Sequence, residues 1–329
     1  MTDSPFVCGL AVSGPTNSDR QLVRHEPTLN VFADGEGESG EAYLSHFVFG
    51  PEMREHFGAN GGSPAGFAGP CAARHVVLDI DRPDLNDALA DCRKLVQTVM
   101  RRYPEMEDDP PIYFSGNKGF HVLVELAHRP APAVGFHRVA KTYCEGLAAL
   151  AEVAIDGGIY DLVRIVRLPN TRHPKSGLFK RRVTCEGLFK LELAAILDMA
   201  KLPSGDGIPA VRGSVPQLAL DWAKAEAATS VAATTRAAVR AATGNRDTRV
   251  PKFFMDFLRL GTPEGERHKT LFRVAAWMME QGAGDDFTRL FLTEAAGDLG
   301  LTPDDVARQI ACGIGHALKQ QQAEGGQSP

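Results

Sequence analysis

The stretch HVVLDID, residues 75–81, is the part of the sequence on which the fold prediction depends. Its β-branched residues favour a strand, and it ends in two acids, Asp79 and Asp81. Strand residues two positions apart point to the same face, so the two carboxylates project together. Close carboxylate oxygens suit Mg²⁺ or Mn²⁺, and the stretch therefore predicts a divalent-metal site. Two solvated acids at a strand end remain the alternative.

Helix and strand patterns alternate on the C-terminal side of this strand. Apolar residues recur at helical spacing over 85–103, and Pro104 follows. Two short apolar runs, 112–115 and 120–126, flank a Gly-Asn-Lys-Gly turn and predict a hairpin. A helix over 134–155 and strands over 162–168 and 183–185 complete the pattern. The order predicts an α+β domain, with a mixed sheet covered by helices on one face.

The flanking regions have different patterns. The first seventy residues look irregular, apart from one strand expected over 43–49. Residues 203–216 are rich in Pro, Gly and Ser, which is typical of a linker, and an Ala-rich helix is expected over 218–243. Four helical segments follow, at 252–260, 266–281, 286–298 and 303–320. We expect an α+β domain over 1–202, a linker and Ala-rich helix over 203–249, a helical domain over 250–322 and a polar tail over 323–329.

The composition is that of a soluble globular chain. Of 329 residues, 43% are hydrophobic and 23% are charged, which excludes global disorder. The six cysteines form no CxxC pair, so a sequence-local zinc finger is not expected. No secretory signal or apolar run long enough for a membrane is present, and scattered cysteines suit a reducing compartment, so we expect a cytoplasmic protein without a membrane partner. The net charge of −5 argues against a generally basic binder, but a local basic surface would suffice for nucleic acid.

A glycine-containing segment, SGNKGFH at 115–121, supplies groups that suit a triphosphate. Its glycines, including Gly116, let backbone amides approach a ligand closely. Ser115 adds a hydroxyl, Lys118 a point charge and His121 a ring N–H. The spacing is not that of a Walker A loop, so a P-loop NTPase is disfavoured. A plain hairpin turn remains the alternative.

A single acid, Asp156, follows the apolar residues 153–155 and precedes two glycines. It is a candidate third carboxylate, and ordinary turn chemistry is the alternative. The segment that follows, 164–190, has eight Lys and Arg residues and one acid, Glu186. Such a basic segment is expected to bind the phosphates of a nucleotide or a strand, and a solvated basic hairpin is the alternative. Arg164 and Arg167 are expected on one strand at odd spacing, so they would face opposite sides.

The order along the chain is the acid pair, SGNKGFH, the single acid and the basic segment. In this order they resemble the archaeo-eukaryotic primase superfamily, most closely the primase-polymerases of phages, plasmids and other mobile elements. The matching motifs are LDID at 78–81, SGNKGFH at 115–121 and Ile155-Asp156, and the likeness covers about residues 70–190. A weaker likeness, GERHKTLF at 265–272, resembles a helical domain of such primases, with His268 where asparagine is usual. The resemblance implies an α+β primase core with an RRM-like sheet unit, followed by a small all-α domain.

The resemblance also implies template-directed synthesis or extension of primers in DNA replication. Its substrates would be NTPs or dNTPs and a single-stranded DNA template, with a replicative helicase as a further partner. Asp79, Asp81 and Asp156 would hold two Mg²⁺ or Mn²⁺ ions. The residues expected to bind the nucleotide are Ser115, Gly116, Lys118, His121 and Arg167. Those expected to bind the strand are Arg164, Arg172, Lys175, Lys180, Arg181 and Arg182.

Two other functions fit the same residues. One is a gap-filling repair polymerase of the same superfamily. The other is a non-catalytic module that binds single-stranded nucleic acid on its sheet, although aromatic residues are only 7% of the chain. Metal-dependent incorporation of nucleotide would separate the enzymes from the binding module.

Overall fold

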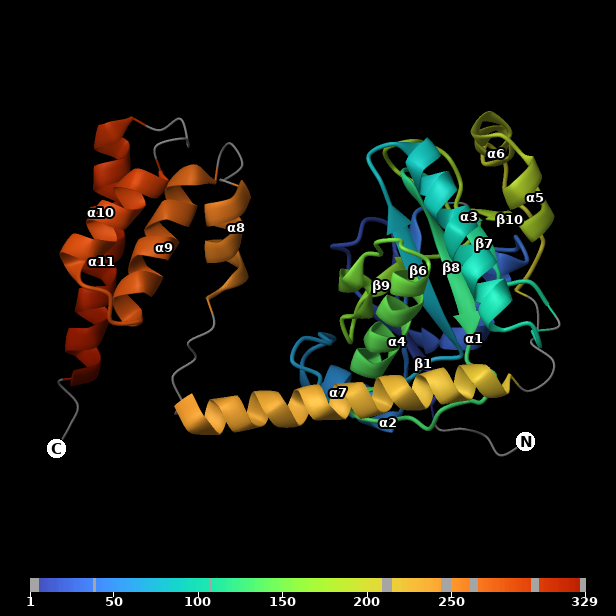
Figure 1. Ribbon diagram of the computed structural model, residues 1–329, viewed down its shortest axis with the longest axis horizontal. Helices are drawn as coiled ribbons and strands as arrows, with labels where there is room; N and C mark the ends of the chain where they lie inside the picture. The colour runs from blue at the N-terminus through green and yellow to red at the C-terminus, as the bar shows by residue number, and fades with distance from the viewer. Residues whose placement is uncertain are drawn as a thin grey trace. The chain divides into compact units, whose positions relative to one another are not determined.

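The computed structural model describes residues 6–37, 40–106, 108–208, 215–243, 250–260, 266–296 and 302–325 (Figure 1). The chain divides into two compact units, Met1–Thr235 and Arg236–Pro329. The first unit contains two sheets and the second contains helices. None of the described helices is both long enough and apolar enough to cross a membrane.

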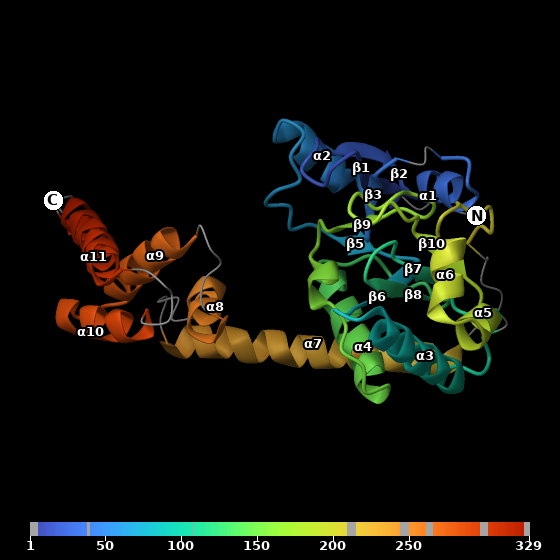
Figure 2. The same ribbon diagram turned by 90° about the horizontal axis from the view of Figure 1, so that it is seen from above.

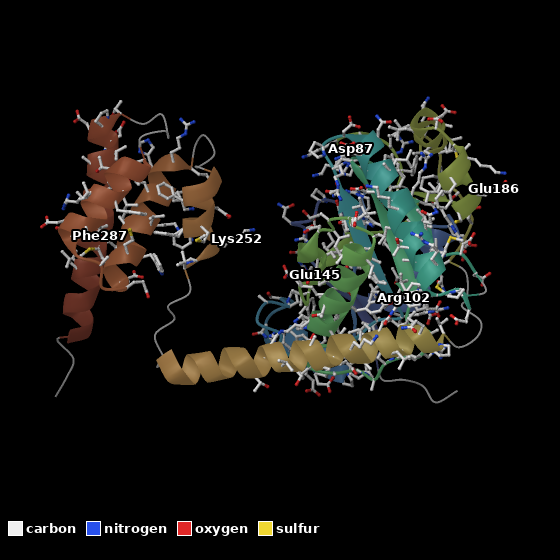
Figure 3. The ribbon with its side chains drawn as sticks, viewed as in Figure 1. Asp87, Arg102, Glu145, Glu186, Lys252 and Phe287 are labelled. Atoms are coloured by element: carbon white, nitrogen blue, oxygen red, sulfur yellow. The ribbon has the colours of Figure 1, made fainter. Side chains whose placement is uncertain are left out.

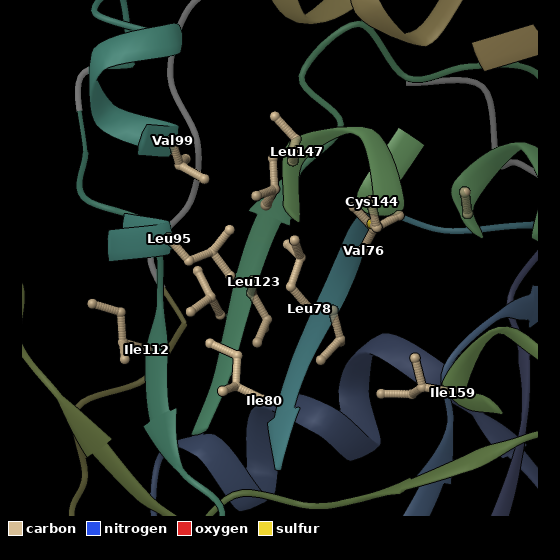
Figure 4. Packing of buried hydrophobic residues seen from close by; sticks show 14 of the residues in the cluster. Val76, Leu78, Ile80, Leu95, Val99, Ile112, Leu123, Cys144, Leu147 and Ile159 are labelled. Atoms are coloured by element: carbon tan, nitrogen blue, oxygen red, sulfur yellow. The ribbon is translucent and has the colours of Figure 1, made fainter. Parts of the chain in front are cut away.

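The strand that ends in Asp79 and Asp81 belongs to a sheet of four antiparallel strands, in the order β10-β7-β8-β6. They are β10 (Arg181–Val183), β7 (Ile112–Phe114), β8 (Gly119–Glu125) and β6 (His75–Asp81). Because side chains alternate along β6, Val76, Leu78 and Ile80 are fully buried on one face. Figure 4 shows these three packed with Leu95 and Leu147 of the covering helices.

Two helices cover that face, α3 (Leu85–Arg102) and α4 (Phe136–Leu150). The side chain of Asp84 caps the start of α3 by accepting a hydrogen bond from the backbone of Asn86, 2.7 Å away. The expected helix over 85–103 and the strands at 75–80, 112–115 and 120–126 are confirmed to within about a residue. The expected helix over 134–155 is shorter, since α4 ends at Leu150 and Glu152 has a left-handed backbone (φ +54°).

A second sheet lies on the other side of the first one, as Figure 2 shows. Its antiparallel strands have the order β5-β4-β1-β3-β9, and β2 pairs with β1. They are β1 (Cys8–Ser13), β2 (Gln21–Arg24), β3 (Ala42–Ser45), β4 (Val48–Phe49), β5 (Cys71–Ala72) and β9 (Ile165–Arg167). The helices α1 (His25–Ala33) and α2 (Pro51–Ala59) belong to the same N-terminal region.

This second sheet corrects two expectations. The described part of the first seventy residues is not irregular, and the described residues of the first unit form two antiparallel sheets instead of one mixed sheet. The strands of this region have two to six residues each, too short for a clear alternating pattern. The single strand expected over 43–49 is two strands, β3 and β4, and β9 joins the N-terminal sheet instead of the sheet of β6.

The C-terminal side of the first unit contains three short elements and the start of a long helix. The short elements are η1 (Gly157–Tyr160), α5 (Cys185–Lys190) and α6 (Leu193–Met199), and the long helix is α7 (Pro216–Thr243). The first half of α7 packs against α3 and α4. The Trp222 ring lies 4.9 Å from the ring of Phe136, and Asp221 accepts two hydrogen bonds from Arg102, labelled in Figure 3.

The second unit is a helical bundle of α8 (Lys252–Leu260), α9 (Arg267–Glu280), α10 (Asp285–Ala295) and α11 (Pro303–Gly325), which confirms the four helices expected there. Its core includes Phe257, Leu271, Val274 and Ile310. The glycine that starts the GERHKTLF motif lies outside the described residues.

We expect Trp222→Ala to lower the free energy of unfolding by about 3 kcal/mol, because Trp222 is 2% exposed and its removal leaves a cavity under α7. Leu220→Ala on the same helix is the matched control, since Leu220 is 58% exposed and should change stability little. Denaturant unfolding of the two variants measures the difference. Equal stability of the two would contradict the packing of α7 on the first unit.

Candidate functional site

The motifs that are separated in sequence meet at one cavity between the two sheets. The cavity has a volume of about 260 Å³ and is called the site cavity below. Eight predicted site residues line it: Asp79, Asp81, Ser115, Lys118, His121, Asp156, Arg164 and Arg167. Tyr43, Asn117 and His173 also line it, although they are not among the site residues predicted from the sequence.

The register of β6 and β8 places the first two motifs side by side. Asp79 lies opposite His121, and Asp81 lies opposite Gly119. A Cβ atom on Gly119 would stand 1.9 Å from the carbonyl oxygen of Ile80 and 2.6 Å from Asp81 Oδ1. Position 119 therefore requires glycine for the two strands to approach beside Asp81. Gly116, in the turn before β8, has φ +92°, a conformation that also favours glycine.

Asp156 reaches the site through the free edge of β6. Its backbone N–H donates a 2.9 Å hydrogen bond to the carbonyl oxygen of Asp79. Its side chain caps η1 by accepting a 2.8 Å hydrogen bond from the backbone of Gly158. Asp156 therefore does cap a turn, which was the alternative role considered from the sequence. It also lines the site cavity.

Asp79 is held at the site with little hydrogen bonding. Its Oδ1 is buried without a hydrogen-bond partner among the described residues, and His121 Nε2 lies 3.4 Å away. Burial first, and then the charges of Asp81 and Asp156, raise the pKa of Asp79 to about 7. Burial, followed by the charge of Lys180, lowers the pKa of His121 well below its usual value, so His121 is a neutral imidazole at pH 7.

Two of the charges that line the site cavity, those of Lys118 and Asp81, form an ion pair. Lys118 Nζ lies 3.1 Å from Asp81 Oδ2, and the two side chains are 58% and 38% exposed. An exposed ion pair of this kind contributes little stability, about 0–1 kcal/mol, so the lysine can exchange its partner at low cost.

Asp79, Asp81 and Asp156 have the right ligand chemistry for a divalent cation, but their side chains are not yet grouped around one point. Three carboxylates and the unpartnered Asp79 Oδ1 are the oxygen donors that Mg²⁺ or Mn²⁺ prefers. In the part of the chain that the structure describes, however, no three His, Cys, Asp or Glu side chains are grouped closely enough to hold a metal. Lys118 contacts Oδ2 of Asp81, and the backbone of Gly158 contacts Oδ1 of Asp156. The second oxygen of each carboxylate would serve as a ligand, and the three acids would have to move closer together before they could share an ion.

Arg167 is fixed by its neighbours. It is 9% exposed, it donates a 2.8 Å hydrogen bond to the carbonyl of Arg172 and another to the Tyr43 hydroxyl, and its guanidinium stacks 4.6 Å from the Tyr43 ring centre. Arg164 is exposed and precedes β9. Because Arg164 lies outside the strand, the expected opposite orientation is wrong, and both arginines line the site cavity.

The basic segment is less uniform than its composition suggests. Lys180 is 4% exposed and donates a 2.7 Å hydrogen bond to the carbonyl of Arg167, and burial lowers its pKa to about 7. A side chain this buried presents little surface to the phosphates of a nucleic-acid strand, which was the role expected of it. Arg182 donates to the carbonyls of Asp206 and Gly207, and Arg181 is partly buried. Arg172 and Lys175 are exposed, as the expected strand contacts require.

Comparisons with known proteins give few matches. No family model matches the chain, and no curated protein matches it. Among solved structures, it is similar to a crystal structure of primase RepB′ at 14% identity and a TM-score of 0.32, over 99% of this chain and 96% of that one. A similarity this weak carries no argument about fold or function.

We expect Asp79→Asn to stabilise the metal-free protein at pH 8. The folded-state pKa of about 7 is above the usual 3.8, so the wild type should lose stability as the pH rises from about 4 to 7, and the amide removes that loss. The melting temperature at pH 8 should rise by roughly 2–4 °C per kcal/mol regained. Melting curves in EDTA at pH 5 and pH 8 test this.

The control is Asp198→Asn, because the Asp198 carboxylate on α6 is exposed and paired with Lys201. That variant should gain no stability at pH 8. An Asp79→Asn protein that melts below the wild type at pH 8 would contradict the charge repulsion described for the site.

Proposed function

We propose that the chain is a template-directed nucleotidyltransferase of the primase-polymerase type, which uses nucleoside triphosphates on a single-stranded DNA template. One observation carries the proposal: the acid pair, the SGNKGFH segment, Asp156 and two arginines of the basic segment line the same cavity. These segments span residues 79–167, and their convergence is the arrangement that the primase resemblance implies.

The charges in the site cavity support a triphosphate substrate. Acids lie on β6 and at the start of η1, while Lys118, Arg164 and Arg167 come from the turn before β8 and from β9 and the residue preceding it. Bound divalent cations would neutralise the triphosphate and lower the pKa of the attacking 3′-hydroxyl. Asp79, Asp81 and Asp156 would hold these cations. Such a reaction depends mainly on positioning and electrostatics.

The other side chains have separate tasks in this proposal. Lys118 would leave Asp81 and bind a phosphate oxygen once a cation neutralises that carboxylate. His121, as a neutral imidazole, would donate one ring N–H and orient either Asp79 or a phosphate. Arg167 is held in place by Tyr43 and the backbone of Arg172, so it would meet a phosphate from a fixed position. Glu41, 3.5 Å away, already balances part of its charge.

The test is a synthesis assay with labelled nucleotide on single-stranded DNA. It is run with and without a primer, with NTPs and dNTPs separately, and with Mg²⁺ or Mn²⁺. We expect metal-dependent incorporation, and a loss of about 100-fold or more in Asp156→Asn, because that change removes an anionic ligand. Asp87→Asn is the matched control, since Asp87 is exposed on α3 (Figure 3). Substantial synthesis by Asp156→Asn would count against the assignment.

The nucleotide-binding and strand-binding residues can be separated by substitution. Lys118→Ala should raise the KM for nucleotide and leave DNA binding unchanged. Arg172→Ala and Lys175→Ala should weaken single-stranded DNA binding and reduce its log–log salt slope by roughly 0.7 for each phosphate that the variant no longer binds. DNA titrations at several salt concentrations, beside nucleotide titrations, measure both effects.

Lys190→Ala is the control for this pair of measurements. Lys190 belongs to the same basic segment, but it is paired with Glu186 on α5. It should change neither the salt slope nor the KM. The reverse pattern, in which Lys118→Ala alters the salt slope and Arg172→Ala alters the KM, would show that the two assignments are exchanged.

A second candidate function is a non-catalytic module that binds single-stranded nucleic acid. Two observations favour it. Lys118 is paired with Asp81, and no three His, Cys, Asp or Glu side chains among the described residues are grouped closely enough to hold a metal. DNA binding without any metal-dependent incorporation would support this candidate. A preference for gapped duplex over single-stranded template would instead favour the repair polymerase.

A further inference from the structure

The free edge of β6 presents a structural problem. β6 is the last strand of its sheet and pairs with β8 on one side only. Backbone groups on the other side still need partners, because unpaired buried polar groups are costly. Val77 has both groups satisfied there: its N–H donates to His46 Nε2 at 3.3 Å, and its carbonyl accepts a 2.7 Å bond from the Tyr160 hydroxyl.

His46 connects this edge to the turn of Asp156. It lies between β3 and β4 and is 6% exposed. Its second ring nitrogen, Nδ1, lies 3.2 Å from the carbonyl oxygen of Ile159 in η1. A backbone N–H can only donate and a carbonyl can only accept, so the partners require a neutral ring with its proton on Nδ1. The ring also stacks on Phe47 at 4.4 Å.

We propose that His46 is a positioning residue that fixes the spacing between Asp79 and Asp156. Its two bonds end two residues before Asp79 and three residues after Asp156, so one ring joins the two segments that supply these acids. His46 does not line the site cavity, and its effect is exerted through the backbone. The effect on turnover rests on the proposed function, whereas the effect on spacing rests on the hydrogen bonds alone.

Two substitutions separate the ring from its hydrogen bonds. His46→Phe keeps a ring that can stack on Phe47 and removes both hydrogen bonds. His46→Gln can keep an acceptor for the Val77 N–H but loses the bond to Ile159. The matched control is His25→Phe. His25 also has a ring nitrogen bonded to a backbone carbonyl, that of Ser45 at 2.9 Å, but this bond ends on β3 and does not reach β6 or η1.

The experiment measures three properties of the full chain. Amide hydrogen exchange at Val77 and Asp156 reports the free edge of β6. Mn²⁺ titration measures the affinity of the three acids for the ion, and the synthesis assay gives kcat and KM. For His46→Phe we expect exchange at both amides to be about 10-fold faster or more, with the amide of Leu78, which faces β8, unchanged.

We also expect weaker Mn²⁺ binding, and a kcat lower by on the order of 10- to 100-fold with the nucleotide KM nearly unchanged, because small misplacements of reacting groups are costly. His46→Gln should give intermediate values, and it replaces His46→Phe if that variant does not fold. His25→Phe should match the wild type in all three measurements.

Two results would overturn the proposal. One is wild-type exchange at Asp156 in a folded His46→Phe protein. The other is faster exchange with unchanged Mn²⁺ affinity, which would make His46 merely structural. A wild type that makes no product would overturn the proposed function instead, and the exchange and Mn²⁺ measurements would still decide the role of His46.

Discussion

The hydrogen bond from the backbone of Asp156 to the carbonyl of Asp79 joins two segments that are 77 positions apart, and the site depends on it. It exists because β6 is an edge strand with unpaired backbone groups inside the protein. If another strand paired with β6, Asp156 would be displaced from the acid pair. The same edge binds His46 and Tyr160, so the N-terminal sheet and η1 are positioned by one strand.

The position of Asp79 creates a free-energy cost that the isolated protein relieves only in part. Its carboxylate is buried, lies near two other acids, and has an oxygen without a hydrogen-bond partner among the described residues. Lys118 pairs with Asp81 and Lys180 donates to a carbonyl, so their charges offset only part of the rise in the pKa of Asp79. Buried repulsion of this kind is what a bound cation would remove, and it is also what shifts pKa values at functional sites. The metal-free protein is therefore more stable when Asp79 is neutral, whereas the proposed activity requires the ionised carboxylate.

The sequence predicted the central elements well because each has a long, uninterrupted pattern. The apolar spacing of 85–103 and the run at 75–81 specify α3 and β6, and the acid pair follows from the two-residue period of the strand. The N-terminal sheet could not be predicted, since its strands are short and pair with a distant partner, β9. Tyr43 lies on β3 of that sheet and His46 lies between β3 and β4, so no local signal identifies them. Asp156 is identified from the sequence only because it matches a family motif.

The basic segment shows where composition fails as a guide to function. A count of charges treats Lys180 and Lys175 alike, yet one is buried between the sheets and the other is exposed. The difference arises from pairing: β10 aligns with β7, and Lys180, which precedes β10, is placed over the Tyr113 ring at 5.3 Å. A lysine buried there holds the carbonyl of Arg167, and Arg167 in turn is held by Tyr43. Part of the positive charge therefore organises the wall of the site cavity, and a smaller part remains exposed to meet a strand.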